Sequence, residues 1–325
     1  MNSTPLPTRT LGPGGPQVGA IGLGCMGMSW AYNPEDRDDE RSIAVIRHAL
    51  EIGVTLIDTA DVYGPFTNEE LVGRALEGRR GDAILATKCG LEAVSVEPML
   101  IARNGRPEHV REAIDASLRR LQTDHVDLYQ LHRVDPAVPV EETWGAMAEA
   151  VAAGKARAIG MSEASVEELD AAHAIHPVAS LQSEFSLWER GPVANGVLDW
   201  CRRHDAAFIP FSPLGRGFLT GHVTQATITE GDMRATNPRF APEAMDENVA
   251  IVDRVRAVAA RHDATPGQVA LAWLLAQYDG IVPIPGTRRV ERLAENAGAG
   301  RLRLSPDDLA ELDALPAPAG ARYAV

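Results

Sequence analysis

Short apolar runs alternate with longer segments of helical periodicity along this chain. The apolar runs have the length of buried strands, and we place eight of them at residues 19–23, 55–58, 83–87, 126–131, 158–161, 180–184, 207–211 and 280–284. Segments with apolar residues three or four positions apart predict eight helices near residues 39–52, 68–76, 108–121, 140–153, 165–175, 193–204, 250–261 and 290–296. Strands and helices therefore alternate along the whole chain.

This alternation predicts a closed (β/α)8 TIM barrel rather than an open sheet. No long Ser/Gly linker and no break in composition divides the chain, so we expect a single domain over residues 1–325. The remaining segments have places around such a barrel. Residues 9–18 predict an N-terminal hairpin that caps the barrel bottom, residues 265–277 and 305–315 predict extra C-terminal helices, and residues 221–247 predict a long loop.

Composition and charge limit the classes of partner. The chain has 325 residues, of which 45% are hydrophobic and 23% charged, which is ordinary for a protein with a large core and argues against disorder. With 31 Lys and Arg against 45 Asp and Glu the net charge is −14, so the surface should repel nucleic-acid phosphates and anionic lipid. We therefore expect neither a nucleic-acid partner nor a membrane partner.

The cysteines and the N-terminal segment favour a cytoplasmic protein. Cys25, Cys89 and Cys201 are odd in number and widely spaced, which suits reduced thiols better than disulfides. Residues 1–16 lack the apolar stretch of a signal peptide, and no run approaches the roughly 18 apolar residues of a membrane span. Cys201 and His204 stand without a second pair of ligands, so we predict no metal site.

The segment Gly-Leu-Gly-Cys-Met-Gly at 22–27 matches the G-x-G-x-x-G pattern of Rossmann domains. In a Rossmann domain this pattern leads directly into a helix whose N-terminus holds a pyrophosphate. Here residues 28–38 contain Trp30, Tyr32, Pro34 and several charged residues before any helical periodicity begins. We therefore interpret the glycines as a loop that lets the backbone approach a ligand at the barrel mouth.

Four polar residues follow three consecutive predicted strands, at the end of a barrel where active sites lie. They are Asp58, Tyr63, Lys88 and His132. Taken singly, they could be a helix cap, loop packing, a solvated charge and a buried histidine. Together they form a chemically coherent set: an ammonium beside Tyr63 should lower the pKa of its phenol, and Asp58 would keep that ammonium charged. His132 would donate a hydrogen bond to a substrate oxygen, so the set suits protonation of a carbonyl oxygen during reduction.

Several separate motifs occur in order along the chain. They are Gly-Leu-Gly at 22–24, Leu-Ile-Asp-Thr-Ala-Asp-Val-Tyr-Gly at 56–64, Ala-Thr-Lys at 86–88, Asp-Leu-Tyr-Gln-Leu-His at 127–132, Gly-Met-Ser at 160–162, Phe-Ser-Pro-Leu-Gly at 211–215, and Ile-Pro-Gly-Thr at 284–287 with Glu-Asn at 295–296. In these motifs, over residues 10–297, the sequence resembles the aldo-keto reductase family. Its segments His-Arg-Val-Asp-Pro at 132–136 and Ser-Pro-Leu-Gly-Arg-Gly at 212–217 most resemble the branch of bacterial and plant enzymes that reduce aldehydes and ketones.

The resemblance implies an oxidoreductase that reduces aldehydes or ketones to alcohols by hydride transfer from NADPH, which is bound in extended form. It implies that Asp58, Tyr63, Lys88 and His132 are the catalytic tetrad and that Tyr63 is the general acid. It also implies that Ser162 and Gln182 hold the carboxamide of the cofactor and that Phe211 stacks on its nicotinamide ring. The other expected cofactor contacts at the barrel mouth are Gly24, Met26, Asp58, Ser212, Pro213, Leu214, Gly215 and Arg216.

Glu163 departs from the family pattern, in which many relatives have Asn directly after the serine. A glutamate can accept a hydrogen bond from the carboxamide nitrogen but cannot donate one to its oxygen. The alternative interpretation of Glu163 is an acid in the first turn of the next helix.

The segment after residue 285 bears on the choice of cofactor. Gly286, Thr287 and Arg288 are predicted to open a helix whose free N–H groups suit an anion, with Arg288 and Arg292 four residues apart on one face. Two guanidiniums suit a 2′-phosphate, which favours NADPH over NADH. The resemblance adds Glu295 and Asn296 as contacts to the adenine. The alternative is a solvated face with Glu291 and Glu295 as ion-pair partners.

The substrate should be a small carbonyl compound held by loops at the barrel mouth, including part of residues 221–240. Trp30 and Tyr32 would form an apolar wall; the full expected set is Met28, Trp30, Tyr32, Tyr63, Leu91, His132 and Arg133. Two other classes of function remain open: a cofactor-binding regulatory subunit, and a Schiff-base aldolase with Lys88 as nucleophile. The sequence is compatible with a monomer or a homo-oligomer, and with either direction of reaction.

Overall fold

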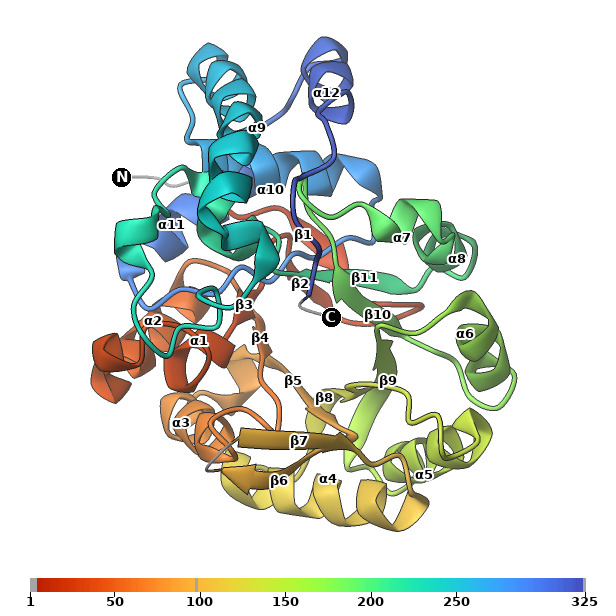
Figure 1. The fold of residues 1–325 in the computed structure, drawn as a ribbon. Helices are drawn as coiled ribbons and strands as arrows, with labels where there is room; N and C mark the ends of the chain where they lie inside the picture. Colours follow the sequence, from red (N-terminus) through yellow and green to blue (C-terminus); the bar gives the residue numbers. More distant parts are fainter. Residues whose placement is uncertain (1–4, 97–98, 324–325) are drawn as a thin grey trace.

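The computed structural model describes residues 5–96 and 99–323, in which parallel strands form a barrel inside a ring of helices (Figure 1). The sheet runs in the order β11-β10-β9-β8-β5-β4-β3. Its strands are β3 (Leu23–Gly24), β4 (Leu56–Asp58), β5 (Ile84–Cys89), β8 (Val126–Leu131), β9 (Ala156–Ser162), β10 (Ser180–Glu184) and β11 (Ala207–Phe211). Every neighbouring pair is parallel, so the carboxyl ends of the strands meet at one mouth.

The predicted eighth strand closes the barrel without forming a regular strand. Val282 N–H and Ile284 N–H donate to carbonyls of β11, and the carbonyl of Pro283 accepts from Gly22 N–H on the other side. Only isolated bridges, Phe208 to Ile281 and Gly24 to Gly286, are formed there. Pro283 and Pro285 have no N–H group, so they cannot donate to β3 and that side of the ladder is incomplete. The (β/α)8 prediction is confirmed, whereas the prediction of a regular strand over 280–284 is wrong.

Several of the helices that cover the barrel begin where a polar cap or a proline favours a first turn. Around the strands lie α2 (Asp39–Glu51), α3 (Thr67–Leu76), α4 (Pro107–Leu121), α5 (Val140–Ala152), α6 (Val166–His173), α8 (Val197–Arg203) and α11 (Val290–Gly298). In α6, Ser165 and Glu168 form a capping box. The helix predicted over 193–204 is divided into α7 (Gly191–Ala194) and α8, because Gly196 between them takes a φ of 81°.

The core has two layers. Inside the barrel, Leu56, Ala86, Leu128 and Ile209 pack against Leu11 and Val18. Leu11 follows β1 (Thr8–Thr10) and Val18 lies in β2 (Gln17–Gly19), an antiparallel pair, so the predicted N-terminal hairpin closes the end of the barrel opposite the mouth. Gly19 belongs to this hairpin, which makes the first barrel strand shorter than the predicted 19–23. A larger apolar layer, which includes Trp144, Trp200 and Trp273, joins the strands to the surrounding helices.

Several segments differ from the sequence expectation. A hairpin of β6 (Leu91–Val96) and β7 (Met99–Arg103) follows β5, although no strands were predicted there. The long loop is shorter than 221–247, because α9 spans Pro242–Arg261 with a proline in its first turn. The extra helices α10 (Pro266–Gln277) and α12 (Pro306–Asp313) are present as predicted.

The short elements are α1 (Met26–Ser29) and the 3-10 turns η1 (Pro34–Asp36), η2 (Arg80–Asp82), η3 (Gly215–Thr220), η4 (Gln225–Thr227), η5 (Pro238–Phe240) and η6 (Ala299–Arg301). Within the described part of the chain, none of the helices is long and apolar enough to span a membrane.

Candidate active site

The ammonium of Lys88 lies at the centre of the barrel mouth. It is fully buried and donates to Asp58 Oδ1 at 2.6 Å, to the carbonyl of Thr59 at 2.8 Å and to Tyr63 Oη at 3.2 Å. An ammonium has three N–H groups, so these three acceptors match its donors and hold it in one orientation. The predicted group of Asp58, Tyr63 and Lys88 is therefore brought together by β4, the loop after it, and β5.

Asp58 is held from a second side by two glutamines. Its other oxygen, Oδ2, accepts from Gln182 Nε2 at 2.9 Å and from Gln130 Nε2 at 3.3 Å. Both glutamines are buried, and they come from β10 and β8, which lie on either side of β9. Gln130 was not singled out from the sequence, although it lies within the Asp-Leu-Tyr-Gln-Leu-His motif. The carboxylate of Asp58 thus makes hydrogen bonds on both of its oxygens, as a buried charge requires.

Burial and charge act in opposite directions on the two groups that could exchange a proton. Burial raises the pKa of the Tyr63 phenol above its ordinary value, while the neighbouring ammonium of Lys88 opposes that rise. Burial lowers the pKa of Lys88, but Asp58 and Tyr63 outweigh it and leave that pKa raised. The expected lowering of the Tyr63 pKa by Lys88 is thus overcome by burial, because desolvation is the larger effect. Tyr63 is therefore a neutral phenol beside a charged ammonium.

His132 directly follows β8 and faces Tyr63. Their ring centroids are 5.7 Å apart and the rings are nearly perpendicular. Burial, together with the charges of Lys88 and Arg133, holds the pKa of His132 well below its usual range, so the imidazole is neutral near pH 7. Its buried Nδ1 has no hydrogen-bond partner among the described residues. All four residues of the predicted tetrad therefore lie at one place.

The residues expected to hold the nicotinamide lie in three successive strands beside this group. Ser162, Gln182 and Phe211 come from β9, β10 and β11. Arg133, expected among the substrate residues, lies at this end as well: its Nη1 donates to Ser162 Oγ at 3.0 Å, and its guanidinium lies 6.0 Å from the centre of the Phe211 ring. Arg133 was predicted to contact the substrate, and it therefore also lies beside residues that were predicted to contact the cofactor.

Glu163 precedes the next helix and is not an acid of its first turn, so that interpretation is wrong. Its Oε1 accepts from the backbone N–H of Glu184 at 2.9 Å, and its Oε2 pairs with Arg322 at 2.9 Å. The first turn of α6 instead contains Glu167 and Glu168. The side chain of Glu163 is thus directed toward the C-terminal part of the chain.

The turn after β11 places its backbone close to the mouth. Ser212, Gly215 and Arg216 all have positive φ angles. A Cβ atom on Gly215 would lie 2.7 Å from the ring of Trp188, so a side chain cannot be accommodated there. Pro213 and Leu214 lie within this turn, and Arg216 lies 3.5 Å from the carboxylate of Glu184. The segment 212–216 is a rigid, closely packed loop next to Phe211.

The segment 286–296, which was expected to bind the adenine end of the cofactor, differs in detail from the prediction. Helix α11 begins at Val290, so Gly286, Thr287 and Arg288 precede it rather than opening it, and Arg288 is not on a helix face with Arg292. Arg292 pairs with Glu295 at 2.6 Å, as the solvated alternative predicted. Gly286 instead lies beside Gly24 in a parallel bridge, and Asn296 is buried.

Other arginines approach Arg288 from the segment after β3. Burial lowers the pKa of Arg288, and the charges of Arg41, Arg37 and Arg289 lower it further, while Asp36 opposes them. Nε of Arg37 and Nε of Arg41 are buried without a hydrogen-bond partner among the described residues. Sequence reasoning missed Arg37 and Arg41, because they stand in an acidic run, Glu-Asp-Arg-Asp-Asp-Glu-Arg at 35–41, that resembles a solvated surface.

The apolar side of the mouth is smaller than expected. The Trp30 ring lies 6.0 Å from that of Tyr63, and Met26, Leu91 and Ala93 pack against the same group. Met28 is buried and belongs to the outer core. The ring of Tyr32 faces the guanidinium of Arg234 at 5.2 Å. Of the three residues predicted after the first strand, only Trp30 lies beside Tyr63.

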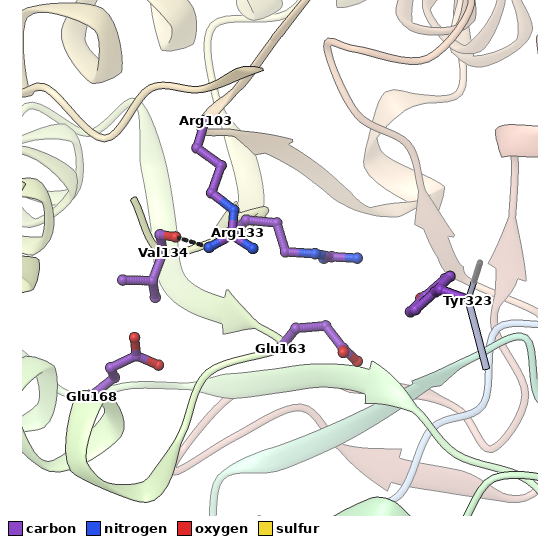
Figure 2. A pocket seen from close by; sticks show the side chains of 6 residues that line it. All are labelled: Arg103, Arg133, Val134, Glu163, Glu168 and Tyr323. Carbon is purple, nitrogen blue, oxygen red and sulfur yellow. Dashed lines mark hydrogen bonds between the residues drawn. The ribbon is translucent and has the colours of Figure 1, made fainter. Parts of the chain in front are cut away.

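A cavity of about 350 Å³ opens beside Arg133. It is lined by Arg103, Arg133, Val134, Glu163, Glu168 and Tyr323. Figure 2 shows Arg133 extending between Arg103 and Tyr323, above the carboxylate of Glu163. Arg103 comes from the unpredicted β6–β7 hairpin and donates to the carbonyl of Val134 at 3.0 Å. The cavity is therefore predominantly polar and charged, in contrast to the side formed by Trp30.

Comparisons with known proteins agree with this fold. The model of the aldo/keto reductase family matches residues 20–317. A protein from Glycine max named probable aldo-keto reductase 1 is 42% identical over 317 residues, which cover 96% of this chain and 90% of that protein. A glycerol dehydrogenase from Gluconobacter oxydans has a similar solved structure, with a TM-score of 0.85 and 29% identity over 94% of each chain.

An aldo/keto reductase from Klebsiella pneumoniae, solved in complex with NADP and acetate, has a TM-score of 0.72 and 29% identity, covering 97% of this chain and 98% of that one. Family model, sequence relative and solved structures thus agree with the barrel fold. The chain belongs to the aldo/keto reductase family.

Proposed function

We propose that this protein reduces aldehydes or ketones to alcohols with NADPH as the hydride donor. The observation that carries the proposal is the buried ammonium of Lys88, shared between Asp58 and Tyr63. This arrangement supplies a proton donor with a charge beside it, as protonation of a carbonyl oxygen requires. The relative from Klebsiella pneumoniae was crystallised with NADP, which supports the same cofactor here.

The described residues fit such a dinucleotide at both ends. At the mouth, Phe211 offers a half-buried ring from β11, and Ser162 and Gln182 offer a hydroxyl and an amide from β9 and β10. At the adenine end of the cofactor, the charges of Arg37 and Arg41 act on Arg288. The buried Nε atoms of Arg37 and Arg41 have no hydrogen-bond partner among the described residues. Unpaired guanidinium N–H groups suit a phosphate. When bound, the cofactor supplies the hydride that adds to the carbonyl carbon.

Tyr63 is proposed as the general acid. Its phenol is neutral at physiological pH because burial raises its pKa, so its proton is available for the substrate oxygen. The phenolate formed by this transfer would lie 3.2 Å from the ammonium of Lys88, whose charge stabilises it. Asp58, Gln130 and Gln182 would hold Lys88 in place through the hydrogen bonds of the carboxylate.

His132 is proposed to orient the carbonyl group. A neutral imidazole has one donor and one acceptor nitrogen, and its low pKa keeps it in that form. Because the ring of His132 stands edge-on to that of Tyr63, both side chains can donate a hydrogen bond to the same substrate oxygen. Trp30 would cover the apolar part of the substrate. Arg133, which lines the polar cavity, would contact the polar part of the substrate.

The same geometry argues against a Schiff-base aldolase. A nucleophilic lysine needs a neutral amine and therefore a lowered pKa. In this chain the pKa of Lys88 is raised, and three acceptors hold its ammonium. A retained adduct on Lys88 after borohydride reduction, with no dependence on NADPH, would contradict the reductase proposal.

The direct test is an activity screen of the purified chain against a panel of aldehydes and ketones, with NADPH and NADH in parallel. We expect loss of NADPH absorbance at 340 nm with at least one aromatic or aliphatic aldehyde and a slower reaction with NADH. Tight binding of NADPH without turnover across the panel would favour a cofactor-binding regulatory protein instead.

A further inference from the structure

The end of the chain returns to the barrel mouth along a defined path. After α12 the chain runs inward over the barrel (Figure 1). Ala319 and Asn248 exchange two hydrogen bonds of 2.8 and 3.1 Å, and Asn237 Nδ2 donates to the carbonyl of Arg322 at 3.0 Å. Gly320 takes a φ of 87°, and a Cβ there would lie 2.7 Å from the carbonyl of Pro238. We name residues 319–323 the tail segment.

Arg322 fastens the tail segment to two strand ends. Its Nη1 lies 2.9 Å from Glu163 Oε2, and its Nε donates to Glu184 Oε2 at 2.7 Å. Glu184 is 4% exposed, so its carboxylate depends on paired cations, and Arg216 is the second of these at 3.5 Å. Glu163 follows β9 and Glu184 ends β10, so Arg322 joins the tail segment to neighbouring strands of the barrel.

The tail segment lies on two residues of the proposed cofactor site. The guanidinium of Arg322 is 6.0 Å from the centre of the Phe211 ring, and that of Arg216 is 5.3 Å from the Tyr323 ring. Tyr323 also lines the cavity beside Arg133 (Figure 2). Phe211 is proposed to contact the nicotinamide, and Arg216 belongs to the turn proposed to contact the cofactor next to it. The tail segment therefore spans the nicotinamide end of the site.

We propose that the tail segment is a latch over the nicotinamide end of the cofactor site, which must open for the dinucleotide to enter and to leave. The fastening is the pair of salt bridges from Arg322 to Glu163 and Glu184. This inference rests on the proposed binding of NADPH, but it concerns the rate of cofactor exchange and not the chemistry of reduction.

The contacts of Arg322 are suited to opening as well as closing. Its Nη2 is buried without a hydrogen-bond partner among the described residues, and an unsatisfied buried donor offsets part of the favourable pairing. Its side chain is also 27% exposed, so water can replace the carboxylates when the segment lifts. Glu163 also accepts a hydrogen bond from the backbone N–H of Glu184 through its other oxygen, Oε1, so the strand side of the latch has a support that does not involve Arg322.

The test measures the association and dissociation rate constants of NADPH by stopped-flow fluorescence. The variants are Arg322→Ala and Glu163→Gln, which remove the ion pair from either side, and Arg322→Lys, which retains a cation. Arg111→Ala is the control, because Arg111 forms an ion pair with Glu149 between α4 and α5, outside the mouth. Circular dichroism of each variant shows whether the barrel is intact.

A latch reduces the fraction of molecules open to cofactor, so its removal accelerates both steps. We expect Arg322→Ala to raise both rate constants by about tenfold, as the loss of a charge-assisted pair predicts, with Glu163→Gln acting in the same direction. Arg322→Lys should lie closer to the wild type, and Arg111→Ala should match it.

Two results would overturn the latch. One is an unchanged pair of rate constants in Arg322→Ala. The other is faster dissociation with unchanged association, which would make Arg322 a direct contact of the bound cofactor. Failure of the wild type itself to bind NADPH would instead overturn the proposed function, so the two failures are distinguishable.

Discussion

Lys88 Nζ lies 3.2 Å from Tyr63 Oη and 2.6 Å from Asp58 Oδ1, with all three side chains buried at the barrel mouth. The ammonium thus connects a permanent carboxylate with a phenol that becomes charged only when it gives up its proton. Because the surroundings exclude water, the charge of Lys88 acts on that phenol with little screening.

Tyr63→Phe removes the proposed proton donor and leaves the packing of the ring unchanged. We expect kcat for aldehyde reduction to fall by about 10² to 10⁴-fold, the usual contribution of a general acid. Binding of NADPH, followed by its fluorescence, should be retained. A variant with full reductase activity would show that another group donates the proton.

Lys88→Met leaves Asp58 buried without its cation. Removal of one partner of a buried ion pair costs about 3–5 kcal/mol, so the free energy of unfolding in urea should fall by that amount and reductase activity should be lost. Arg111→Ala, which removes an exposed ion pair on the outer helices, is the control. Equal stability of the two variants would contradict the structural role assigned to Lys88.

Reduction should persist into alkaline solution. Tyr63 must be protonated to act, and burial raises its pKa above the ordinary value of 10.0. We therefore expect kcat/KM for reduction to stay level up to about pH 9. The measurement is a pH profile with a single aldehyde in a constant-ionic-strength buffer. A decline centred near pH 7 would mean that Lys88, and not burial, dominates the pKa of Tyr63.

The stability of the fold should decrease in mild acid because of His132. Its pKa is well below 6.5 in the folded protein, so below pH 6.5 the unfolded chain binds a proton that the folded chain does not. The contribution of His132 to the free energy of unfolding is therefore fully present above the pKa that His132 has in the unfolded chain. Below that pKa the free energy of unfolding falls as the pH decreases, by up to about 1.4 kcal/mol per pH unit for this group.

His132→Gln should lessen this dependence. The pKa values of His109 and His173 are also lowered, but both histidines are present in each protein, so their contribution cancels in the comparison. Denaturant unfolding at pH 7.5 and pH 5.5 measures the difference. Identical acid destabilisation in the two proteins would show that His132 binds a proton as readily when folded as when unfolded.

Arg288→Gln should weaken the preference for NADPH. Loss of one charge-assisted hydrogen bond to a phosphate corresponds to about 10-fold or more in affinity. We expect KM for NADPH to rise by that factor and KM for NADH to stay the same, which makes NADH the internal control. Arg41→Gln should act in the same direction if the arginines gathered after β3 share the phosphate. An equal rise for both cofactors would place Arg288 outside the phosphate site.

The order of elements and the position of the tetrad were accessible from the sequence. Hydrophobic periodicity predicts strands and helices locally, and parallel strands bring their carboxyl ends to one mouth whatever the loops between them do. Asp58, Lys88 and His132 therefore had to meet once the barrel was inferred, and Tyr63 follows Asp58 closely enough to join them. The motifs of the family led to the same four residues.

Contacts between distant segments were decided only by the tertiary structure. Nothing near Glu163 in the sequence indicates Arg322, and nothing near Arg288 indicates Arg37 and Arg41, because their meeting depends on how the loops and the tail segment cross the mouth. Met28 illustrates the same limit, since a one-turn helix directs it into the core. The pKa of Tyr63 illustrates it too: the sequence supplied the neighbouring charge, but the degree of burial, which sets the sign of the shift, exists only in the folded chain.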